Sequence, residues 1–281
     1  MAHKHWENPE VTSYGRLPSR STFAHNNTLV LNGTWRFKRY ANPLEVDSDW
    51  FDPDLDDRSW LEMKVPSLWT RQETPGEDLP IYTNVRMPFS EEPPYAPKLN
   101  PTGVYRRFFK LPKTWEKKRV VIYLGGVENC FYLHCNGQEV GFAKDCRLPS
   151  EFDLSGYIQA GDNQLSIKVL RFSDSSYIED QDQWWHAGIH RDIYLYATEC
   201  VYIRDVFAKP NLDVESGRGE IELDIRLGGR PREALNHSIE AELIKPNGKS
   251  VFSSPLSATV DRSHYYPTVG RGARLNLQKQ F

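Results

Sequence analysis

Short alternating runs of apolar and polar residues, bounded by turn residues, recur along most of this chain, whereas helical periodicity is scarce. In the run RVVIYLGG, Val120, Ile122 and Leu124 fall on one side, as alternate residues of a strand do. The run CFYLHCNGQEVGFA predicts a hairpin with Asn136 and Gly137 at its turn, because both central positions of a type I′ turn need positive φ. We therefore expect an all-β protein with few, short helices.

The pattern of strand-like runs divides the chain into three parts. Residues 1–28 are polar and irregular, with too few apolar residues for a core of their own. Residues 29–200 carry several strands without crossover helices, which predicts a β-sandwich or a jelly roll. Residues 201–281 begin a new series of strands, but an immunoglobulin-like sandwich needs about 100 residues, so we expect a partial, truncated one. The tail from Arg262 shows little alternation and is expected to fray or to lie outside the fold.

Charge and composition exclude several classes of protein. The formal net charge is -3, with 35 basic and 38 acidic side chains mixed along the chain, which leaves no basic stripe for a nucleic acid. The amino-terminal run MAHKHWENPE lacks the apolar stretch of a secretory signal, and no segment approaches the roughly 18 apolar residues of a membrane span. Together these features predict a cytoplasmic protein that binds neither nucleic acid nor membrane. The four cysteines lack CxxC spacing, so neither a zinc site nor a disulfide framework is expected.

One acidic and aromatic run gives the strongest functional signal. Residues 171–189 read RFSDSSYIEDQDQWWHAGI and place four carboxylates beside a tyrosine and two tryptophans, directly after a strand-like segment. Carboxylates accept hydrogen bonds from hydroxyls, and flat rings cover the C–H face of a sugar, so this composition is typical of carbohydrate recognition. A solvated acidic loop, with tryptophans that close the end of a sandwich core, would have the same composition.

A second candidate lies in the proline-rich segment between Trp60 and Tyr105. Proline supplies no ladder donor, so this segment cannot occupy the middle of a sheet. A loop of this length is usually functional or disordered, and its aromatic residues favour an ordered, functional loop. Asn84 lies in its middle, and an asparagine amide can both donate to and accept from a sugar hydroxyl.

Between Trp6 and about Leu195 the chain carries a series of motifs whose order matters for comparison with known families. They are WENPEVT with RLPSR, LNGTWRF, VPSLW, PIYTNV, NPTGVYRR, GVENCFYLHCNGQEVG, RLPSEFDLS and RFSDSSYIEDQDQWWHAGIHRD. In these motifs the chain resembles the amino-terminal region of β-galactosidases of glycoside hydrolase family 2, the lactose-operon type. The resemblance implies a galactose-binding-like jelly roll followed by an immunoglobulin-like domain, in agreement with the strand pattern. It also implies a cytoplasmic, homo-oligomeric enzyme that hydrolyses lactose and other β-D-galactosides by a retaining mechanism.

The resemblance further implies roles for single residues. The aspartate of RFSDSSY, here Asp174, is expected to hold a sodium or potassium ion and to contact the galactose. The asparagine of IYTNV, here Asn84, is expected to reach the same pocket, and Trp184, Trp185 and His186 are expected at the pocket rim. No ligand role transfers to the other acidic side chains of the motif, for which we expect buried structural hydrogen bonding: Glu179, Asp180 and Asp182.

The catalytic machinery is expected outside this chain. The resemblance places the two catalytic glutamates and the magnesium ligands on a (β/α)₈ barrel after the second domain. Such a barrel takes about 250 residues, whereas about 80 follow Cys200. The sequence therefore predicts the amino-terminal portion of a galactosidase that is inactive alone. A stand-alone carbohydrate-binding module and a structural or oligomerisation scaffold stay open as alternatives. The stretch from His5 to Asn27 is expected to gain order only by docking, which would support assembly with other subunits or with a complementary fragment, and a loose tail is the alternative.

Overall fold

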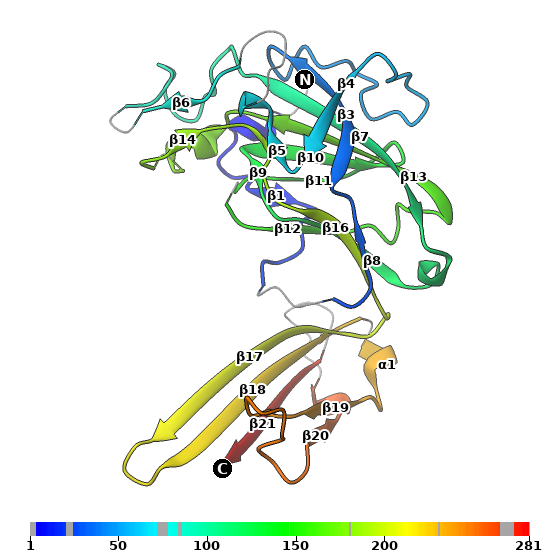
Figure 1. The fold of residues 1–281 in the computed structure, drawn as a ribbon, viewed down its shortest axis with the longest axis vertical. Coiled ribbons are helices and arrows are strands. Elements are labelled where there is room, and N and C mark those ends of the chain that lie inside the picture. Colours follow the sequence, from blue (N-terminus) through cyan, green and yellow to red (C-terminus); the bar gives the residue numbers. More distant parts are fainter. Residues whose placement is uncertain are drawn as a thin grey trace. The chain divides into compact units, whose positions relative to one another are not determined.

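The computed structural model describes residues 4–20, 25–71, 78–83, 86–145, 147–179, 181–229, 231–264 and 273–280. These residues form an all-β chain, as the alternating runs predict, and the chain divides into two compact units (Figure 1). The first unit ends at Ala197 and the second continues from Thr198, with Arg20 also assigned to the second. In the ranges that the structure describes, no helix is long and apolar enough to cross a membrane.

The first unit is a sandwich of two main sheets. The larger is a seven-stranded antiparallel sheet in the order β1-β11-β10-β13-β7-β3-β4, and the smaller has four strands in the order β12-β8-β16-β2. The larger sheet comprises β1 (Ser13–Tyr14), β3 (Gly33–Tyr40), β4 (Leu61–Val65), β7 (Thr102–Leu111), β10 (Cys130–Cys135), β11 (Gln138–Ala143) and β13 (Gly161–Leu170). The smaller comprises β2 (Thr28–Val30), β8 (Arg119–Leu124), β12 (Ser150–Asp153) and β16 (Ile193–Thr198).

Short elements complete the first unit. One small sheet has the order β5-β15-β9, and in another β6 pairs with β14. These strands are β5 (Ser67–Leu68), β6 (Ile81–Tyr82), β9 (Val127–Glu128), β14 (Trp184–Trp185) and β15 (Gly188–Ile189). The helical turns of this unit are all 3-10 turns in the described ranges: η1 (His5–Glu7), η2 (Trp69–Arg71), η3 (Lys113–Trp115) and η4 (Asp174–Tyr177).

The core between the two main sheets follows the alternation of their strands. Val120, Ile122 and Leu124 of β8, predicted to share one side, are buried together with Ile167 and Val169 of β13. Alternate residues of a strand project to the same face, so each sheet contributes one apolar face to this layer. The predicted hairpin between β10 and β11 is confirmed as well, because its two turn residues have φ of 49° and 77°.

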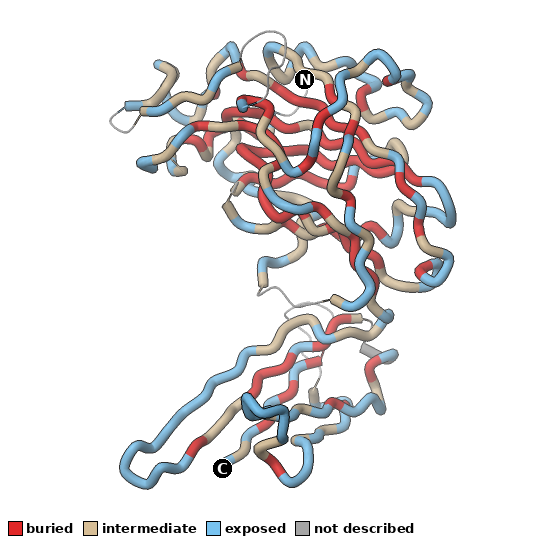
Figure 2. The backbone as a smooth tube through the Cα atoms, in the orientation of Figure 1, coloured by how far each residue is buried: buried red, intermediate tan, exposed pale blue. Residues whose placement is uncertain are grey.

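A second apolar layer covers the outer face of the seven-stranded sheet. Tyr132 and Phe142 from that sheet pack with Trp6, Phe172 and Trp185, which come from the amino-terminal segment and the acidic motif. Both faces of the sheet are therefore buried, and Figure 2 shows buried stretches along its central strands. This explains why every residue of β10 is buried and why its burial does not alternate, since a strand covered on both faces has no solvent side.

The amino-terminal segment is part of this outer layer. Trp6 is 5% exposed, β1 pairs with β11 through Ser13 and Ala143, and the N–H of Leu17 donates to the carbonyl oxygen of Glu151 at 2.8 Å. The surface that orders this segment is thus the sandwich of the same chain. Assembly with another subunit stays a prediction.

The second unit has a three-stranded sheet in the order β17-β18-β21 and a two-stranded sheet of β19 and β20. Its elements are β17 (Tyr202–Asp213), β18 (Arg218–Gly228), α1 (Pro231–Ala234), β19 (Ser238–Ala241), β20 (Leu256–Thr259), η5 (Arg262–His264) and β21 (Arg274–Gln280). The expectation of a frayed tail is wrong for β21, which pairs with β18 over seven residues and buries Leu275 and Leu277. The run RLNLQKQ does alternate, and its partner strand completes the sheet.

Candidate functional site

Asp174 lies at the start of η4, the short 3-10 turn that follows β13. Ser173 caps this turn: its Oγ accepts a hydrogen bond from the N–H of Ser175 at 3.2 Å, and its own N–H donates to Oγ of Ser176 at 3.1 Å. The two reciprocal bonds satisfy backbone groups that the start of a helical turn leaves unpaired. The carboxylate of Asp174 is therefore fixed at the end of a central strand of the sheet.

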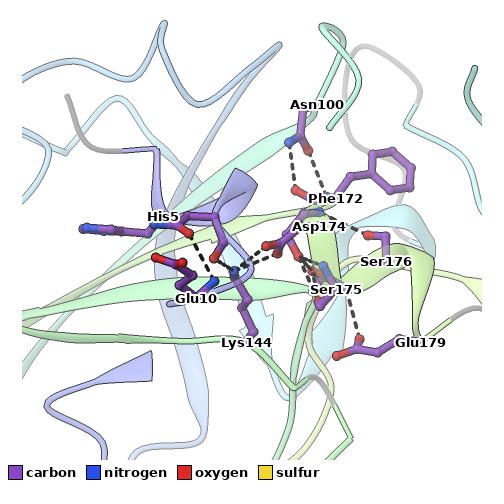
Figure 3. Close-up of polar contacts among 12 residues, drawn as sticks. His5, Glu10, Asn100, Lys144, Phe172, Asp174, Ser175, Ser176 and Glu179 are labelled. Atoms are coloured by element: carbon purple, nitrogen blue, oxygen red, sulfur yellow. Dashed lines mark hydrogen bonds and ion pairs between the residues drawn. The ribbon is translucent and has the colours of Figure 1, made fainter. Parts of the chain in front are cut away.

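The Asp174 carboxylate pairs with the ammonium group of Lys144, which follows β11 (Figure 3). Nζ lies 2.7 Å from Oδ1 and 2.8 Å from Oδ2, and the side chains of Lys144 and Asp174 are 5% and 6% exposed. The contact to Oδ1 is an ion pair without good hydrogen-bond geometry, so among the described residues Oδ1 has no hydrogen-bond donor. Burying an unpaired carboxylate is strongly unfavourable, so Lys144 stabilises Asp174 in this position.

Lys144 also connects the ion pair to the amino-terminal segment. Its Nζ donates to the carbonyl oxygen of Asn8 at 2.9 Å, and its backbone N–H donates to that of Thr12 at 3.0 Å. Three segments that are distant in sequence therefore meet at one buried nitrogen. Sequence analysis missed Lys144, although a lysine directly after the apolar run VGFA is a signal for a cation that needs a buried partner.

Asn129 holds the other side of the turn. Its Oδ1 accepts hydrogen bonds from Oγ of Ser173 at 2.5 Å and Oγ of Ser175 at 3.1 Å, and its Nδ2 donates to Oε2 of Glu179 at 3.1 Å. The hydrogen bonding predicted for Glu179 is therefore confirmed, but the residue is half-buried and not buried as predicted. Asn129 itself was missed, because nothing in the run VENC indicates that its amide lies beside the turn.

The remaining acids of the motif behave differently. Asp182 is exposed, and its Oδ1 accepts a hydrogen bond from the hydroxyl group of Tyr82 at 2.6 Å. The prediction of structural hydrogen bonding is right for Asp182. The prediction of burial is wrong, because Asp182 is exposed to solvent just before β14. Asp180 lies outside the described residues.

Trp184 and Tyr82 form an exposed aromatic pair. They are cross-strand neighbours in the small sheet of β6 and β14, with ring centroids 5.4 Å apart. Trp184 is 56% exposed and Tyr82 is 49% exposed, so both rings present apolar surface to solvent. Asn84, the predicted sugar contact, lies outside the described residues, but the strand before it is held beside Trp184 by this pairing.

The next two residues of the predicted rim lie deeper. Trp185 is 8% exposed and packs on Phe172 with ring centroids 6.0 Å apart, which places it in the outer apolar layer and not at a rim. His186 is half-buried, and its Nδ1 lies 3.0 Å from Oγ1 of Thr70. Burial lowers the pKa of His186, which favours the neutral imidazole.

Arg171 ties the loop before β6 to the end of β13, and sequence analysis missed this role. Its Nη1 donates to Oδ1 of Asp78, and its Nη2 donates to the carbonyl oxygens of Leu79 at 2.9 Å and Trp185 at 3.2 Å. The other oxygen of Asp78 accepts a hydrogen bond from Nε1 of Trp69 at 2.6 Å. Both charged side chains are nearly buried, at 3% for Arg171 and 8% for Asp78, so the pair is a firm anchor for β6.

A hollow of about 360 Å³ lies next to this anchor. Arg171, Phe172, Asp78 and Phe89 contribute to its wall, and its volume is within the range of small-ligand sites, about 300–1,000 Å³. Asp174 follows two of these residues in sequence but does not line the hollow.

The donor set around Asp174 does not fit the sodium or potassium ion that the resemblance implies. Both carboxylate oxygens lie within 2.8 Å of the positively charged Nζ of Lys144, which occupies the place of a cation. The described part of the chain also holds no group of three histidine, cysteine or acidic residues that could bind a metal ion. Magnesium ligands were not expected in this chain, and their position elsewhere stays a prediction.

Comparison with known proteins identifies the family. Residues 29–199, which include the Asp174 turn and both of its buried partners, match the family described as glycosyl hydrolases family 2, sugar binding domain. The chain belongs to glycosyl hydrolase family 2. The matching residues lie in the first unit, so a sugar is the class of ligand that this unit binds.

Relatives and solved structures agree with this family 2 assignment. A Beta-galactosidase of Psychromonas ingrahamii is 43% identical in an alignment of 235 residues that covers 79% of this chain and 22% of the relative. A Beta-galactosidase of Vibrio cholerae is 39% identical in an alignment of 269 residues that covers 92% of this chain and 26% of the relative. The chain therefore spans about a quarter of the length of these relatives.

The structure of a Bifidobacterium dentium β-glucuronidase, complexed with coumarin-3-O-glucuronide, gives a TM-score of 0.65 at 17% identity. The match covers 93% of this chain and 43% of that one. A β-glycosidase from Bacteroides vulgatus gives a TM-score of 0.64 at 19% identity, covering 91% of this chain and 29% of its own. At these identities the likeness shows the fold alone.

Proposed function

We propose that this chain is the amino-terminal, sugar-binding portion of a β-galactosidase that hydrolyses terminal β-D-galactosyl residues by a retaining mechanism. The observation that carries the proposal is the Asp174 carboxylate, held at the end of a central strand by Lys144 and by the capped turn. Relatives named Beta-galactosidase, at 38% to 43% identity over most of this chain, support galactosides as the substrate class.

Asp174 is the principal sugar contact in this proposal. Its Oδ1 is buried and has no hydrogen-bond donor among the described residues, so in this proposal it accepts from a galactose hydroxyl once a barrel completes the site in the full-length enzyme, while Oδ2 accepts from Lys144. Because the turn is capped and the carboxylate is paired, little ordering is needed when a sugar binds, which lowers the entropic cost. Asn84 supplies a second contact through its amide group, which both donates and accepts.

The catalytic pair is assigned to a barrel in the full-length enzyme. A retaining mechanism needs two carboxyl groups about 5 Å apart, one as nucleophile and one as acid. Asp174 is neutralised by an ammonium group and Glu179 accepts from the Asn129 amide, so neither is placed for these roles. We further propose that magnesium binds on that barrel, and that the complete enzyme is a cytoplasmic homo-oligomer.

An autonomous carbohydrate-binding module is the second candidate, and the exposed rings of Tyr82 and Trp184 favour it. Two neighbouring rings can cover the apolar face of a sugar without help from a barrel. Isothermal titration calorimetry of the 281-residue chain with galactose and lactose separates the candidates. An autonomous module gives measurable binding that Trp184→Ala abolishes, whereas a portion that needs a barrel shows almost no affinity.

The main proposal is tested with a chimera in which this chain replaces the matching amino-terminal quarter of the Vibrio cholerae relative. We expect the chimera to hydrolyse a nitrophenyl β-galactoside, the isolated chain to be inactive, and Asp174→Asn to raise the KM of the chimera. Asp182→Asn is the matched control, since it changes an exposed acid of the same motif. An unchanged KM for Asp174→Asn, or turnover by the isolated chain that a substitution within it abolishes, would contradict the proposal.

A further inference from the structure

The buried ion pair of Asp174 and Lys144 has a consequence for the ions that this site requires. We infer that the Lys144 ammonium group supplies, from within the chain, the positive charge that a sodium or potassium ion would otherwise supply beside Asp174. The site then needs no alkali-metal ion. This inference rests on the proposed function, because it concerns the same carboxylate that is proposed to bind the sugar.

The contacts of Nζ are those of a cation site. Two carboxylate oxygens of Asp174 lie at 2.7 and 2.8 Å, and the backbone carbonyl oxygen of Asn8 lies at 2.9 Å. Carboxylate and carbonyl oxygens are the donors that a hard cation prefers. In this chain all three point at a nitrogen that is covalently part of the protein.

A second cation would be disfavoured at the same place. The Lys144 side chain is 5% exposed and its charge is fixed by two segments, so it cannot move away into solvent without breaking both contacts. An added sodium ion at the free side of Oδ1 would lie within a few ångströms of this charge, where repulsion in a poorly solvated site is strong. Because the ammonium group is covalently part of the chain, it cannot dissociate on dilution, whereas a bound ion can.

The test compares the unfolding of the 281-residue chain in different salts. All eight tryptophans lie between residues 6 and 185, so tryptophan fluorescence reports on the first unit alone. We expect the wild-type chain to have the same unfolding midpoint in sodium, potassium and choline chloride at equal ionic strength. Lys144→Ala should lower the midpoint in choline chloride, because it leaves the Asp174 carboxylate buried without a counter-charge.

Cation rescue is the decisive comparison. In Lys144→Ala, sodium chloride or ethylammonium chloride should raise the midpoint above its value in choline chloride, and the recovery should grow with the logarithm of concentration. Asp174→Asn combined with Lys144→Ala should abolish this recovery. Lys168→Ala is the matched control: Lys168 is a half-buried lysine whose Nζ lies 4.7 Å from the ring centroid of Tyr132, and its loss should create no response to sodium.

Two results would overturn the inference. One is a wild-type chain that sodium stabilises more than choline does, and the other is a Lys144→Ala chain that neither cation restores. Should Lys144→Ala not fold in any salt, Lys144→Gln takes its place, since its amide still donates to the carboxylate, and the same comparison decides. No sugar or turnover is involved, so a negative result leaves the proposed function standing, whereas failure of the chimera refutes that function independently.

Discussion

Asp78→Ala is expected to destabilise the first unit strongly, because it leaves the Arg171 guanidinium group buried without its counter-charge. Arg171 is 3% exposed, and Asp78 accepts hydrogen bonds from both Arg171 and Trp69. Removing one partner of a buried ion pair costs about 3–5 kcal/mol. The lost acceptor of the Trp69 indole adds about 1 kcal/mol. The total, about 4–6 kcal/mol, is a large part of the 5–15 kcal/mol by which a domain is usually stable.

Urea unfolding, followed by tryptophan fluorescence, measures this loss in the first unit. A double-mutant cycle with Arg171→Met separates the ion pair from other effects of the substitutions. The double mutant should be more stable than the sum of the single changes predicts, because it leaves no unpaired buried charge. Asp56→Ala is the control, since Asp56 and Arg58 form an exposed pair whose loss should not change stability measurably. A loss below about 1 kcal/mol for Asp78→Ala, or strict additivity in the cycle, would refute this reasoning.

Three further outcomes are expected for the 281-residue chain. Burial lowers the pKa of His134 to about 4 from the ordinary 6.5, so the unfolded state binds more protons between these values. Stability should therefore fall by up to about 1.4 kcal/mol per unit as pH drops from 6.5 to 4, and urea unfolding should show a shallower fall in His134→Gln. Gly188 has φ of +136°, and a Cβ there would lie 2.7 Å from a backbone carbonyl oxygen. Gly188→Ala should therefore lower the free energy of unfolding in urea by about 1–3 kcal/mol. Gly156→Ala is the control and should not lower it, because the space around Gly156 is open. Trp185→Ala should lower the free energy of unfolding, measured by heating, by about 3–5 kcal/mol because the ring of Trp185 is buried. Trp184→Ala should lower it by less than about 1 kcal/mol because the ring of Trp184 is exposed. Equal effects would contradict the assignment of Trp185 to the core.

The fold was predictable where local residues determine it. Asn136 and Gly137 adopt positive φ in the hairpin turn because both residue types tolerate it, and the alternation of Val120 and Ile122 determines which face they bury. Burial of both faces of the larger sheet was not predictable in this way, since the covering residues come from separate loops and from the amino-terminal segment. Strand β21 does alternate and could have been predicted as a strand, but its pairing with β18, about 50 residues earlier in the chain, could not.

The candidate site was likewise predictable only where local residues determine it. The place of Asp174 after a strand follows from its motif, but Lys144 and Asn129 approach it only through pairing between distant strands. One signal was available and not used: neighbouring residues of a strand point to opposite faces, so Trp184 and Trp185 could not both lie at a rim. The exposure of the first and the burial of the second follow from that rule.

Whether Asp174 accepts a hydrogen bond from the sugar is measured most directly with deoxygalactosides. In the chimera, kcat/KM is determined for a nitrophenyl β-galactoside and for analogues that each lack one hydroxyl group, with and without Asp174→Asn. We predict that one analogue is strongly penalised in the unsubstituted chimera and that Asp174→Asn removes most of that penalty, because the one acceptor oxygen that remains faces the Lys144 ammonium group and the NH₂ group replaces the acceptor for the sugar. The same penalty for every analogue in both proteins would show that Asp174 does not contact the sugar.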